Sequence, residues 1–359
     1  MPIKIHNSLS KKKEEFKPLE KGKIKMYVCG PTVYGPGHIG HAKTYTAFDI
    51  IRRYLEFSEF KVKYVVNITD VHDDMIAKAQ EQGITIFELA EKNIKLFFKD
   101  MTTLGIKDSD INPRVTETIP EIIKMTKTLQ EKGFAYETDD GVYFAVEKFP
   151  KYGELAGIKL DKSVTGTRVE TDKYDKENPQ DFALWKKQKP NEPFWESPWG
   201  KGRPGWHIEC SAMNFKHLGE QIDIHGGAVD LIFPHHQNEI AQSEATSGKQ
   251  FVKYWMHAGF LNVEGQKMSK SLGNFITIPE LLAKYDPKVF RFFVAGIHYR
   301  SPIDFTDNSM QIAKNTLEKL NDFLRRIQEV QSTKENPEVE KIISTAQEKF
   351  RKEMDDDFN

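Results

Sequence analysis

The sequence predicts an α/β fold built on a parallel sheet, with an α+β insertion and a mainly helical C-terminal part. The alternating apolar residues of 24–29 predict a strand, and it ends at a loop, 30–40, that is rich in Gly and Pro. Apolar residues spaced three and four apart over 41–57 predict an amphipathic helix, and 62–68 predicts a second strand. This order is typical of a βαβ unit, whose ligand lies at the carboxyl ends of parallel strands.

Further helices are predicted downstream of this unit. Apolar periodicity places two of them over 73–81 and 86–103. The segment Thr118-Ile-Pro-Glu121 combines a capping box with an early proline and predicts the start of another helix. Gly133 predicts the end of that helix, because glycine adopts the left-handed conformation common at helix ends without steric cost.

Residues 135–200 differ in character from the segments around them. They contain short β-like pieces, a polar stretch and turns rich in Pro and Trp, which indicates an insertion between two halves of the sheet. Strand and helix patterns resume at 222–224 and 234–247. After Tyr285 the pattern is mostly helical, most strongly over 309–331. The last residues show no cap or turn signal, as if the chain were cut in mid-course.

Composition and charge limit the class of protein. The 359 residues include 52 Lys and Arg against 53 Asp and Glu, so a strongly basic coat is excluded and DNA is not an expected partner. The two cysteines, Cys29 and Cys210, cannot build a disulfide scaffold and favour a reducing, cytoplasmic location. No long apolar run occurs and the first residues are polar and lysine-rich, so we expect neither a membrane span nor a secretion signal.

The glycine-rich loop matches a dinucleotide-binding fingerprint at Gly35-x-Gly37-x-x-Gly40. An NAD-dependent enzyme is nevertheless disfavoured, because the first glycine lies well beyond the strand end, where the fingerprint needs its tight turn. The loop also places His38 and His41 at the start of the helix. Imidazoles beside the unpaired N–H groups of a helix start suit a triphosphate. Taken alone, one such histidine is as readily a helix-start residue bonded to the backbone.

A second candidate loop is Lys267-Met-Ser-Lys270-Ser271, which precedes a helix start near Pro279. Two lysines and two hydroxyls on such a loop can close over a leaving pyrophosphate and neutralise charge in the transition state. By itself, a lysine–serine loop is most often a solvated turn. Its combination with the histidine motif makes phosphate handling the better interpretation.

These two motifs carry a resemblance to a known family. Gly37-His-Ile-Gly-His41 and Lys267-Met-Ser-Lys-Ser271 resemble the two marks of class I aminoacyl-tRNA synthetases, whose catalytic domain is Rossmann-like. The resemblance covers about residues 24 to 308, and it departs at His72-Asp73-Asp74-Met75, where the family commonly has two acids and a lysine. Any role of that lysine is therefore absent or moved. Five further blocks are similar to cysteinyl-tRNA synthetases: Cys29-Gly-Pro-Thr-Val-Tyr34, Asn67-Ile-Thr-Asp70, Gly205-Trp-His-Ile-Glu-Cys-Ser-Ala-Met213, Asp223-Ile-His-Gly-Gly227 and Pro234-His-His-Gln-Asn-Glu239.

The two cysteines raise the question of a metal site. Cys29, Cys210, His235 and Glu239 form a workable zinc set, since the last two lie on one face of a helix. Spacing alone leaves the question open, because other histidines are near in sequence and two buried thiols need no metal. The resemblance selects these four residues as zinc ligands. It leaves three histidines beside the metal or facing substrate: His207, His225 and His236.

The resemblance also implies a reaction. The carboxylate of L-cysteine would attack the α-phosphate of ATP, with Mg²⁺ bridging phosphate oxygens, and cysteine would then pass to the terminal ribose of tRNA(Cys). Zinc would select cysteine through a thiolate bond that serine cannot match. The residues implied for catalysis are His38, His41, Lys267 and Lys270; those for ATP are Gly37, His38, Gly40, His41, Asp230, Lys267 and Lys270; those for the substrate are Gly30, Thr69, Trp206 and His225.

The resemblance further divides the chain into three segments. We expect a catalytic domain over 1–265, with a connective insertion at about 115–200, and a lysine-loop and stem-contact region over 266–308. Residues 309–359 would be the truncated start of a helical tRNA-binding region. We expect a monomer.

Two other functions are weighed against this one. A ligase of the mycothiol-pathway type would activate cysteine identically but pass it to a small sugar amine. A zinc-binding paralogue without catalysis would act as a regulator, which the intact histidine and lysine motifs disfavour. A path of cations on the helix at 309–331 would favour tRNA: Lys314, Lys319, Arg325 and Arg326.

Overall fold

The computed structural model describes residues 2–158, 180–269, 272–330 and 336–359. Its centre is a four-stranded sheet of order β10-β9-β3-β4, in which all neighbouring strands are parallel. The strands are β3 (Lys23–Val28), β4 (Lys61–Val66), β9 (Ile222–Ala228) and β10 (Val252–Ala258). Helix α1 (Ile39–Phe57) connects β3 to β4, so the predicted βαβ unit is confirmed.

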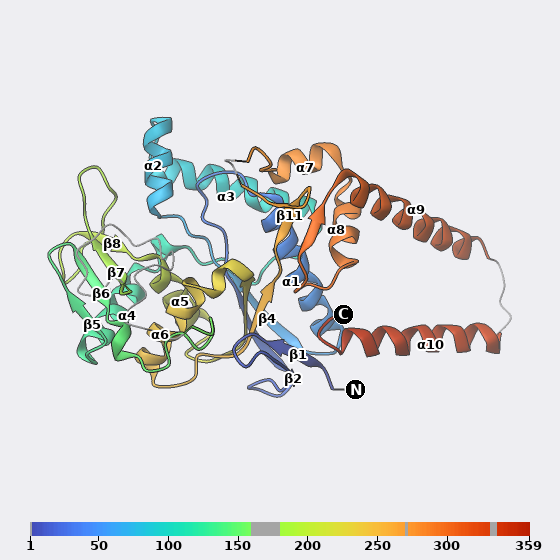
Figure 1. Ribbon diagram of the computed structural model, residues 1–359, viewed down its shortest axis with the longest axis horizontal. Coiled ribbons are helices and arrows are strands. Elements are labelled where there is room, and N and C mark those ends of the chain that lie inside the picture. Colours follow the sequence, from blue (N-terminus) through green and yellow to red (C-terminus); the bar gives the residue numbers. More distant parts are fainter. Residues whose placement is uncertain (1, 159–179, 270–271, 331–335) are drawn as a thin grey trace.

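The side chains of β3 alternate between the two faces of this sheet. Met26 and Val28 belong to a hydrophobic core shared with α1. Tyr27 belongs to a second core, shared with α5 (Trp206–His217) and α6 (His235–Ser247). Helix α1 therefore packs against one face and α5 and α6 against the other, which is the usual arrangement around a buried parallel sheet (Figure 1). The helices predicted after β4 are present as α2 (Asp73–Gln82) and α3 (Ile86–Thr103).

The predicted insertion is a separate antiparallel sheet beside the parallel one. It follows α4 (Ile119–Glu131), has the strand order β5-β6-β7-β8, and leads directly into α5. Short 3-10 turns lie at Val115–Glu117 and Val146–Lys148, and residues 159–179 fall outside the described part of the insertion. The strands are β5 (Ala135–Glu137), β6 (Gly141–Phe144), β7 (Phe182–Lys187) and β8 (Gly202–Pro204).

The capping box expected at the start of α4 is not formed, so that prediction was wrong. Thr118 is the N-cap residue, but its hydroxyl donates to the carbonyl of Arg114 (2.8 Å) and accepts no helix N–H. The carboxylate of Glu121 lies 2.9 Å from Nζ of Lys216 on α5. An ion pair with the neighbouring helix thus replaces the local contact. Gly133, with φ of 79°, follows the end of the helix as expected.

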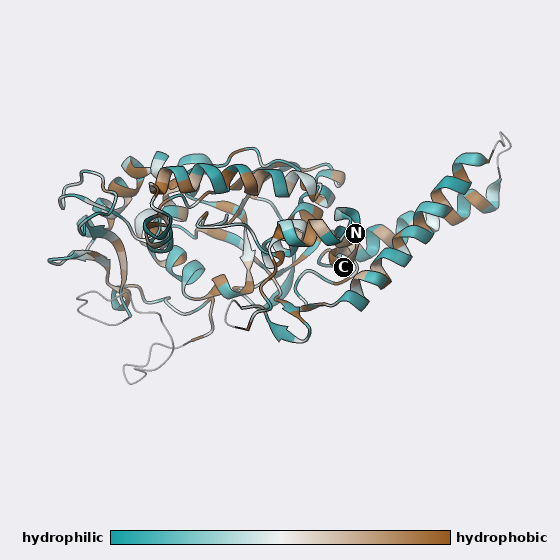
Figure 2. Ribbon diagram, turned by 90° about the horizontal axis from the view of Figure 1, so that it is seen from above, coloured by the Kyte–Doolittle hydropathy of each residue, from teal (hydrophilic) through white to brown (hydrophobic). Residues whose placement is uncertain are grey.

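The elements after β10 form a second, smaller assembly. Strands β11 (Leu261–Val263), β12 (Gln266–Lys267) and β13 (Ile303–Phe305) pair in the order β12-β11-β13. The helices are α7 (Ile278–Lys284), α8 (Pro287–Ala295), α9 (Asp307–Glu329) and α10 (Pro337–Met354). Helix α9 corresponds to the helix expected over 309–331, whose final residue is not among those described. In Figures 1 and 2, α9 and α10 project from the body as two long helices. No described helix is long and apolar enough to cross a bilayer.

The two ends of the chain meet where the projecting pair of helices α9 and α10 joins the body. The N-terminal hairpin of β1 (Lys4–Asn7) and β2 (Lys12–Glu15) lies beside the residues after α10. Asp357 is fully buried; its Oδ1 accepts the backbone N–H of His6 (2.8 Å) and the hydroxyl of Tyr299 (2.9 Å). Phe358 is 7% exposed and packs edge-on against Tyr54 and Tyr299. The sequence shows no turn signal here, yet the segment is packed into the body.

Candidate active site and metal centre

A cavity of about 530 Å³ opens at the carboxyl ends of β3 and β9 and at the start of α1. Its position is the one expected for a ligand of a parallel sheet. Most of the residues implied by the sequence line it: Gly30, His38, Gly40, His41, Trp206, Asp230, Lys267 and the thiol-bearing Cys29. Residues that the sequence analysis did not single out also line it, including Thr44, Gly259, Phe260 and Phe275.

The first turn of α1 holds the two histidines against one another. His38 is the N-cap, and its Nδ1 accepts the N–H of Gly40 (3.1 Å), while Nδ1 of His41 accepts the N–H of His38 (3.4 Å). The rings stack with centroids 3.8 Å apart. Burial, and next the neighbouring His38, lower the pKa of His41 to about 3, so this imidazole is neutral. Because Nδ1 accepts, the proton of neutral His41 is on Nε2, which can donate to an anion.

Two glycines allow this arrangement. A Cβ on Gly40 would lie 2.9 Å from the ring of His38, and a Cβ on Gly37 would lie 2.9 Å from Cδ1 of Ile278. The carbonyl of Gly37 accepts the N–H of Ile278 (2.8 Å). The histidine loop is therefore bonded to the segment that follows the lysine loop, which brings the two distant motifs together.

The lysine loop borders the cavity through the residues that the structure describes. Lys267 ends β12, its side chain is exposed, and its Nζ lies 5.3 Å from the centroid of the Phe260 ring. Asn274 organises the loop, since its Oδ1 accepts the N–H of Ser269 (2.8 Å) and its amide donates to the carbonyl of Lys267 (3.3 Å). Lys270, to which the sequence assigns a catalytic role, lies outside the described residues.

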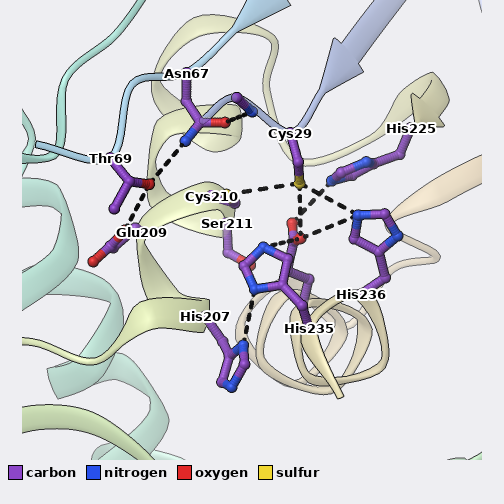
Figure 3. A network of polar contacts seen from close by, with 12 residues as sticks. Cys29, Asn67, Thr69, His207, Glu209, Cys210, Ser211, His225, His235 and His236 are labelled. Carbon is purple, nitrogen blue, oxygen red and sulfur yellow. Dashed lines mark hydrogen bonds and ion pairs between the residues drawn. The ribbon is translucent and has the colours of Figure 1, made fainter. Parts of the chain in front are cut away.

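A cluster of thiol, imidazole and carboxylate groups surrounds Cys29, which also lines the cavity (Figure 3). Cys29 follows β3, Cys210 lies on α5, and His235 and Glu239 lie one turn apart on α6. All four are buried, and one donor atom of each lies within 4.8 Å of the others. The separations are 4.0 Å between the two Sγ atoms, 3.7 Å from Cys29 Sγ to Glu239 Oε1 and 3.1 Å from His235 Nε2 to Glu239 Oε1.

These separations fit a tetrahedral zinc ion. With sulfur at about 2.3 Å and nitrogen or oxygen at about 2.0 Å, two sulfurs lie about 3.8 Å apart, a sulfur–oxygen pair about 3.5 Å and a nitrogen–oxygen pair about 3.3 Å. The charges fit as well. A hydrogen bond from Cys29 lowers the pKa of Cys210. Burial opposes protonation of His235, but Glu239 and Cys210 outweigh it and raise the pKa of His235 to about 10. A bound cation would replace this buried proton.

A second group of donors shares two of these residues. Cys29, His225, His236 and Glu239 also come within 4.8 Å of one another. His236 Nε2 lies 3.3 Å from Cys29 Sγ but 4.0 Å from Glu239 Oε1, and His225 Nε2 contacts the other carboxylate oxygen at 2.9 Å. The first set therefore surrounds a single ion more evenly. His225 is fully buried against Glu239 and stacks on Trp255, and it is not itself among the residues that line the cavity.

Residues outside the candidate ligand set orient the histidines of this cluster, among them His207, which the resemblance places beside the metal or facing substrate. His207 Nδ1 lies 2.9 Å from His235 Nδ1, which leaves His235 Nε2 directed at Glu239. His236 Nδ1 contacts His257 Nε2 (2.8 Å). His257 in turn contacts the hydroxyl of Ser8 (2.8 Å). The sequence carries no signal for His257 or Ser8, because the contacts join the N-terminal hairpin to β10 over a long stretch of chain.

Of the residues implied for the amino acid, Gly30 and Trp206 line the cavity, and Thr69 is joined to Gly30 through Asn67. Asn67 Oδ1 accepts the N–H of Gly30 (2.7 Å), its amide donates to Thr69 Oγ1 (3.3 Å), and Thr69 donates to Glu209 (3.3 Å; Figure 3). Burial raises the pKa of Glu209. The ring of Trp206 lies 4.4 Å from that of His235. Glu209 was missed in the sequence, although its position next to Cys210 could have drawn attention to it.

The unusual segment after Thr69 has a cationic partner from elsewhere in the chain. Asp73 lies 2.9 Å from Nζ of Lys186 on β7 and also pairs with Arg203 on β8. Burial raises the pKa of Asp73, but Lys186 and Arg203 outweigh it and lower it to about 2. The antiparallel insertion therefore supplies an ammonium group at this carboxylate, where the motif itself lacks a lysine.

Comparison with known proteins places this site in a class. The family described as the class I (C) tRNA synthetase catalytic domain matches residues 15–315. The methionyl-tRNA synthetase of Mycobacterium tuberculosis with methionyl-adenylate superposes with a TM-score of 0.64 over 82% of this chain and 68% of that one, at 16% identity. The leucyl enzyme of Agrobacterium radiobacter K84, in a ternary complex with tRNA, gives 0.63 over 90% and 75%, at 10% identity. These structures share the fold, and the chain is a class I aminoacyl-tRNA synthetase.

Close relatives narrow the family. The cysteine–tRNA ligase of Thermococcus onnurineus is 56% identical over the whole chain, which spans 77% of the relative. That of Carboxydothermus hydrogenoformans is 53% identical over 99% of the chain and 77% of the relative. Within its class, the chain belongs to the cysteine–tRNA ligases.

Proposed function

We propose that this chain activates L-cysteine with ATP and transfers it to the 3′ end of tRNA(Cys). The observation that carries the proposal is the cavity in which the histidine motif, the lysine loop and a buried thiol cluster converge. The relatives favour tRNA as the acceptor, since those cited carry the name cysteine–tRNA ligase. No described feature favours a small sugar amine.

In the first step, a carboxylate oxygen of cysteine attacks the α-phosphorus of ATP in line. The bond to the bridging oxygen breaks, pyrophosphate leaves and cysteinyl-adenylate forms. The protein contributes position and charge. We assign Nε2–H of His41 and the paired His38 to the phosphates, and Lys267 with Lys270 to the departing pyrophosphate, alongside Mg²⁺. In the second step, a terminal ribose hydroxyl attacks the adenylate carbonyl and AMP leaves.

We assign the zinc ligands to Cys29, Cys210, His235 and Glu239, on the separations given above. When bound, zinc supplies a soft Lewis acid that favours a thiol over a hydroxyl. The surrounding residues then set the amino acid's position. We assign the backbone atoms of cysteine to Gly30 and Trp206, which line the cavity beside Cys29, and to Thr69, which is bonded to Asn67 and Glu209.

We also propose a role for each of three segments of the chain, although the charges on α9 give little support to the role of the last one. Residues 1–265 would form the catalytic domain with its insertion at about 115–200, 266–308 the lysine-loop and stem-contact region, and 309–359 a helical tRNA-binding part. On α9, however, Lys314 pairs with Glu318, and Arg325 and Arg326 both pair with Asp322. The cations there are largely neutralised, so charge on α9 gives little support to a tRNA path.

The test combines two assays on the same preparation. Cysteine-dependent exchange of pyrophosphate into ATP measures the first step, and transfer of labelled cysteine to total tRNA measures the second. We expect both, with serine rejected. Exchange without transfer to tRNA would contradict the proposal that tRNA is the acceptor. Transfer of cysteine to a small sugar amine would then identify the other candidate acceptor. No cysteine-dependent exchange would contradict the proposal as a whole.

A further inference from the structure

Lys43 on α1 is a buried cation outside the motifs considered so far. Its side chain is 1% exposed, and Nζ donates to the carbonyls of Gly259 (2.6 Å) and Tyr299 (2.9 Å). Within the described residues it forms no ion pair with a carboxylate. Burial lowers its pKa to about 8. An ammonium near the positive end of a helix, without a counter-charge, is costly, and an apolar residue would cost less. Its position therefore calls for a reason.

The two carbonyls belong to segments that shape the nucleotide cavity. Gly259 follows β10 and lines the cavity with Phe260 and Leu261. Its N–H donates to the carbonyl of Tyr299 (2.9 Å), and the N–H of Ile303 donates to the carbonyl of Phe260 (3.0 Å). The wall formed by 259–261 thus runs against the segment around 299–303, backbone to backbone.

The wall formed by 259–261 packs closely against the backbone of the segment around 299–303. A Cβ on Gly259 would lie 2.4 Å from the carbonyl oxygen of Arg300 and 2.5 Å from that of Ser301. The backbone of the 299–303 segment therefore leaves no room for a side chain at the buried Gly259. Without Lys43, the carbonyl of Gly259 would lose its donor in the interior and the two segments would lose the cation that holds them together.

Helix α1, which carries Lys43, also carries the two histidines that line the cavity. His38 and His41 lie in the first turn of α1, five and two residues before Lys43, and line the same cavity as the wall at 259–261. A single rigid helix therefore fixes both the imidazoles and, through the ammonium of Lys43, the backbone that faces them. Lys43 therefore couples the position of one part of the cavity lining to that of another.

We infer that Lys43 is a positioning residue for ATP, which fixes the Gly259–Leu261 wall relative to the histidine motif by binding the carbonyls of Gly259 and Tyr299. The inference rests on the proposed function for the identity of the nucleotide. Lys43 itself does not line the cavity, so it acts through the wall and not by contact with ATP.

The test replaces Lys43 by Met, an unbranched side chain one atom shorter, which fills most of the same space and loses the charge and the donors. Binding of α,β-methylene-ATP is measured by calorimetry, and KM values for ATP and cysteine by pyrophosphate exchange. We expect at least about tenfold weaker analogue binding and a matching rise in KM for ATP. KM for cysteine should stay within about twofold of the parent value, and the zinc content should not change. Lys43→Arg, which keeps the charge and donors, should recover most of the ATP affinity.

Ile51→Ala serves as the matched control on the same helix. Ile51 is buried in the core of α1, away from the cavity, so the variant should lose thermal stability while its ATP affinity stays within about twofold. If Lys43→Met does not fold, Lys43→Gln, which is too short to reach both carbonyls, takes its place with the same expectations.

Three outcomes would decide the matter. Unchanged ATP affinity in the Lys43 variants would overturn the inference. Equal losses for ATP and cysteine, or an equal ATP loss in Ile51→Ala, would assign Lys43 to stability alone and also overturn it. Failure of cysteine-dependent exchange in the parent would refute the proposed function, whereas the calorimetric comparison would still test Lys43.

Discussion

Cys210→Ser tests which residues hold the metal. The substitution replaces one sulfur by oxygen at a fully enclosed position on α5 and changes the side chain little in size. In the first donor set it removes one of two thiols, since the Sγ atoms of Cys29 and Cys210 lie 4.0 Å apart. In the second set, which contains His225 and His236, it removes none. The variant therefore separates the two sets.

The expected magnitude follows from the contacts. Loss of a group that only supports a metal ligand typically costs about 10- to 100-fold in affinity, so loss of a direct ligand should cost at least about 100-fold. Zinc affinity is measured by competition with a chelator, and the sulfur count by X-ray absorption. The parent should show two Zn–S contacts at about 2.3 Å. A variant reloaded with excess zinc should show one.

His236→Gln is the matched comparison. Its Nε2 lies 3.3 Å from Cys29 Sγ, so it is a ligand only in the second set. We expect this variant to lose at most about 10- to 100-fold in zinc affinity, as for a supporting group. Retention of zinc in Cys210→Ser together with its loss in His236→Gln would refute the assignment and favour the second set.

Three further outcomes can be measured separately. Lys270→Ala should slow pyrophosphate exchange by about 10²- to 10³-fold with little change in cysteine binding, and a rate within about threefold of the parent would remove this lysine from the mechanism. Phe358→Ala should lower the free energy of unfolding in urea by about 3 kcal/mol, because the ring is 7% exposed between Tyr54 and Tyr299; a loss below about 1 kcal/mol would contradict that packing. Burial raises the pKa of Asp100 to about 6, so the folded chain holds this proton more tightly than the unfolded chain, and stability falls as pH rises through that value. Asp100→Asn should therefore raise the free energy of unfolding at neutral pH by about 1–2 kcal/mol and flatten its dependence on pH in that range, and an unchanged pH profile would refute the reasoning.

The sequence predicts those features that depend on neighbours in the chain. Alternation over 24–29 and helical periodicity over 41–57 identify β3 and α1, because each period reports which side of a local element is buried. Features that depend on distant partners are missed. The predicted capping box at the start of α4 is absent because Glu121 forms an ion pair with Lys216 on another helix. The packed residues after α10 escape notice because Asp357 finds its partners in β1 and near Tyr299.

The candidate metal site could be predicted only in part from the sequence. The ligand types are visible in the sequence, but spacing could not choose among four histidines, and the choice rested on a resemblance. The structure shows why spacing is insufficient. Consecutive residues His235 and His236 both reach the cluster, one toward Glu239 and the other toward Cys29. Only the three-dimensional arrangement of α6 against β3 distinguishes them.

The position of Cys29 explains how one sheet serves two kinds of chemistry. Val28, the last residue of β3, packs on the face covered by α1, and Cys29 packs on the face covered by α5 and α6. Gly30 then enters the loop that leads to the histidine motif. The proposed thiol-binding cluster and the loop that leads to the proposed phosphate-binding helix start therefore meet at one strand end. A ligand that holds its sulfur at Cys29 would place its carboxylate a few bonds away, toward the cavity where ATP is proposed to bind. This geometry links selection of the side chain to activation of the carboxylate.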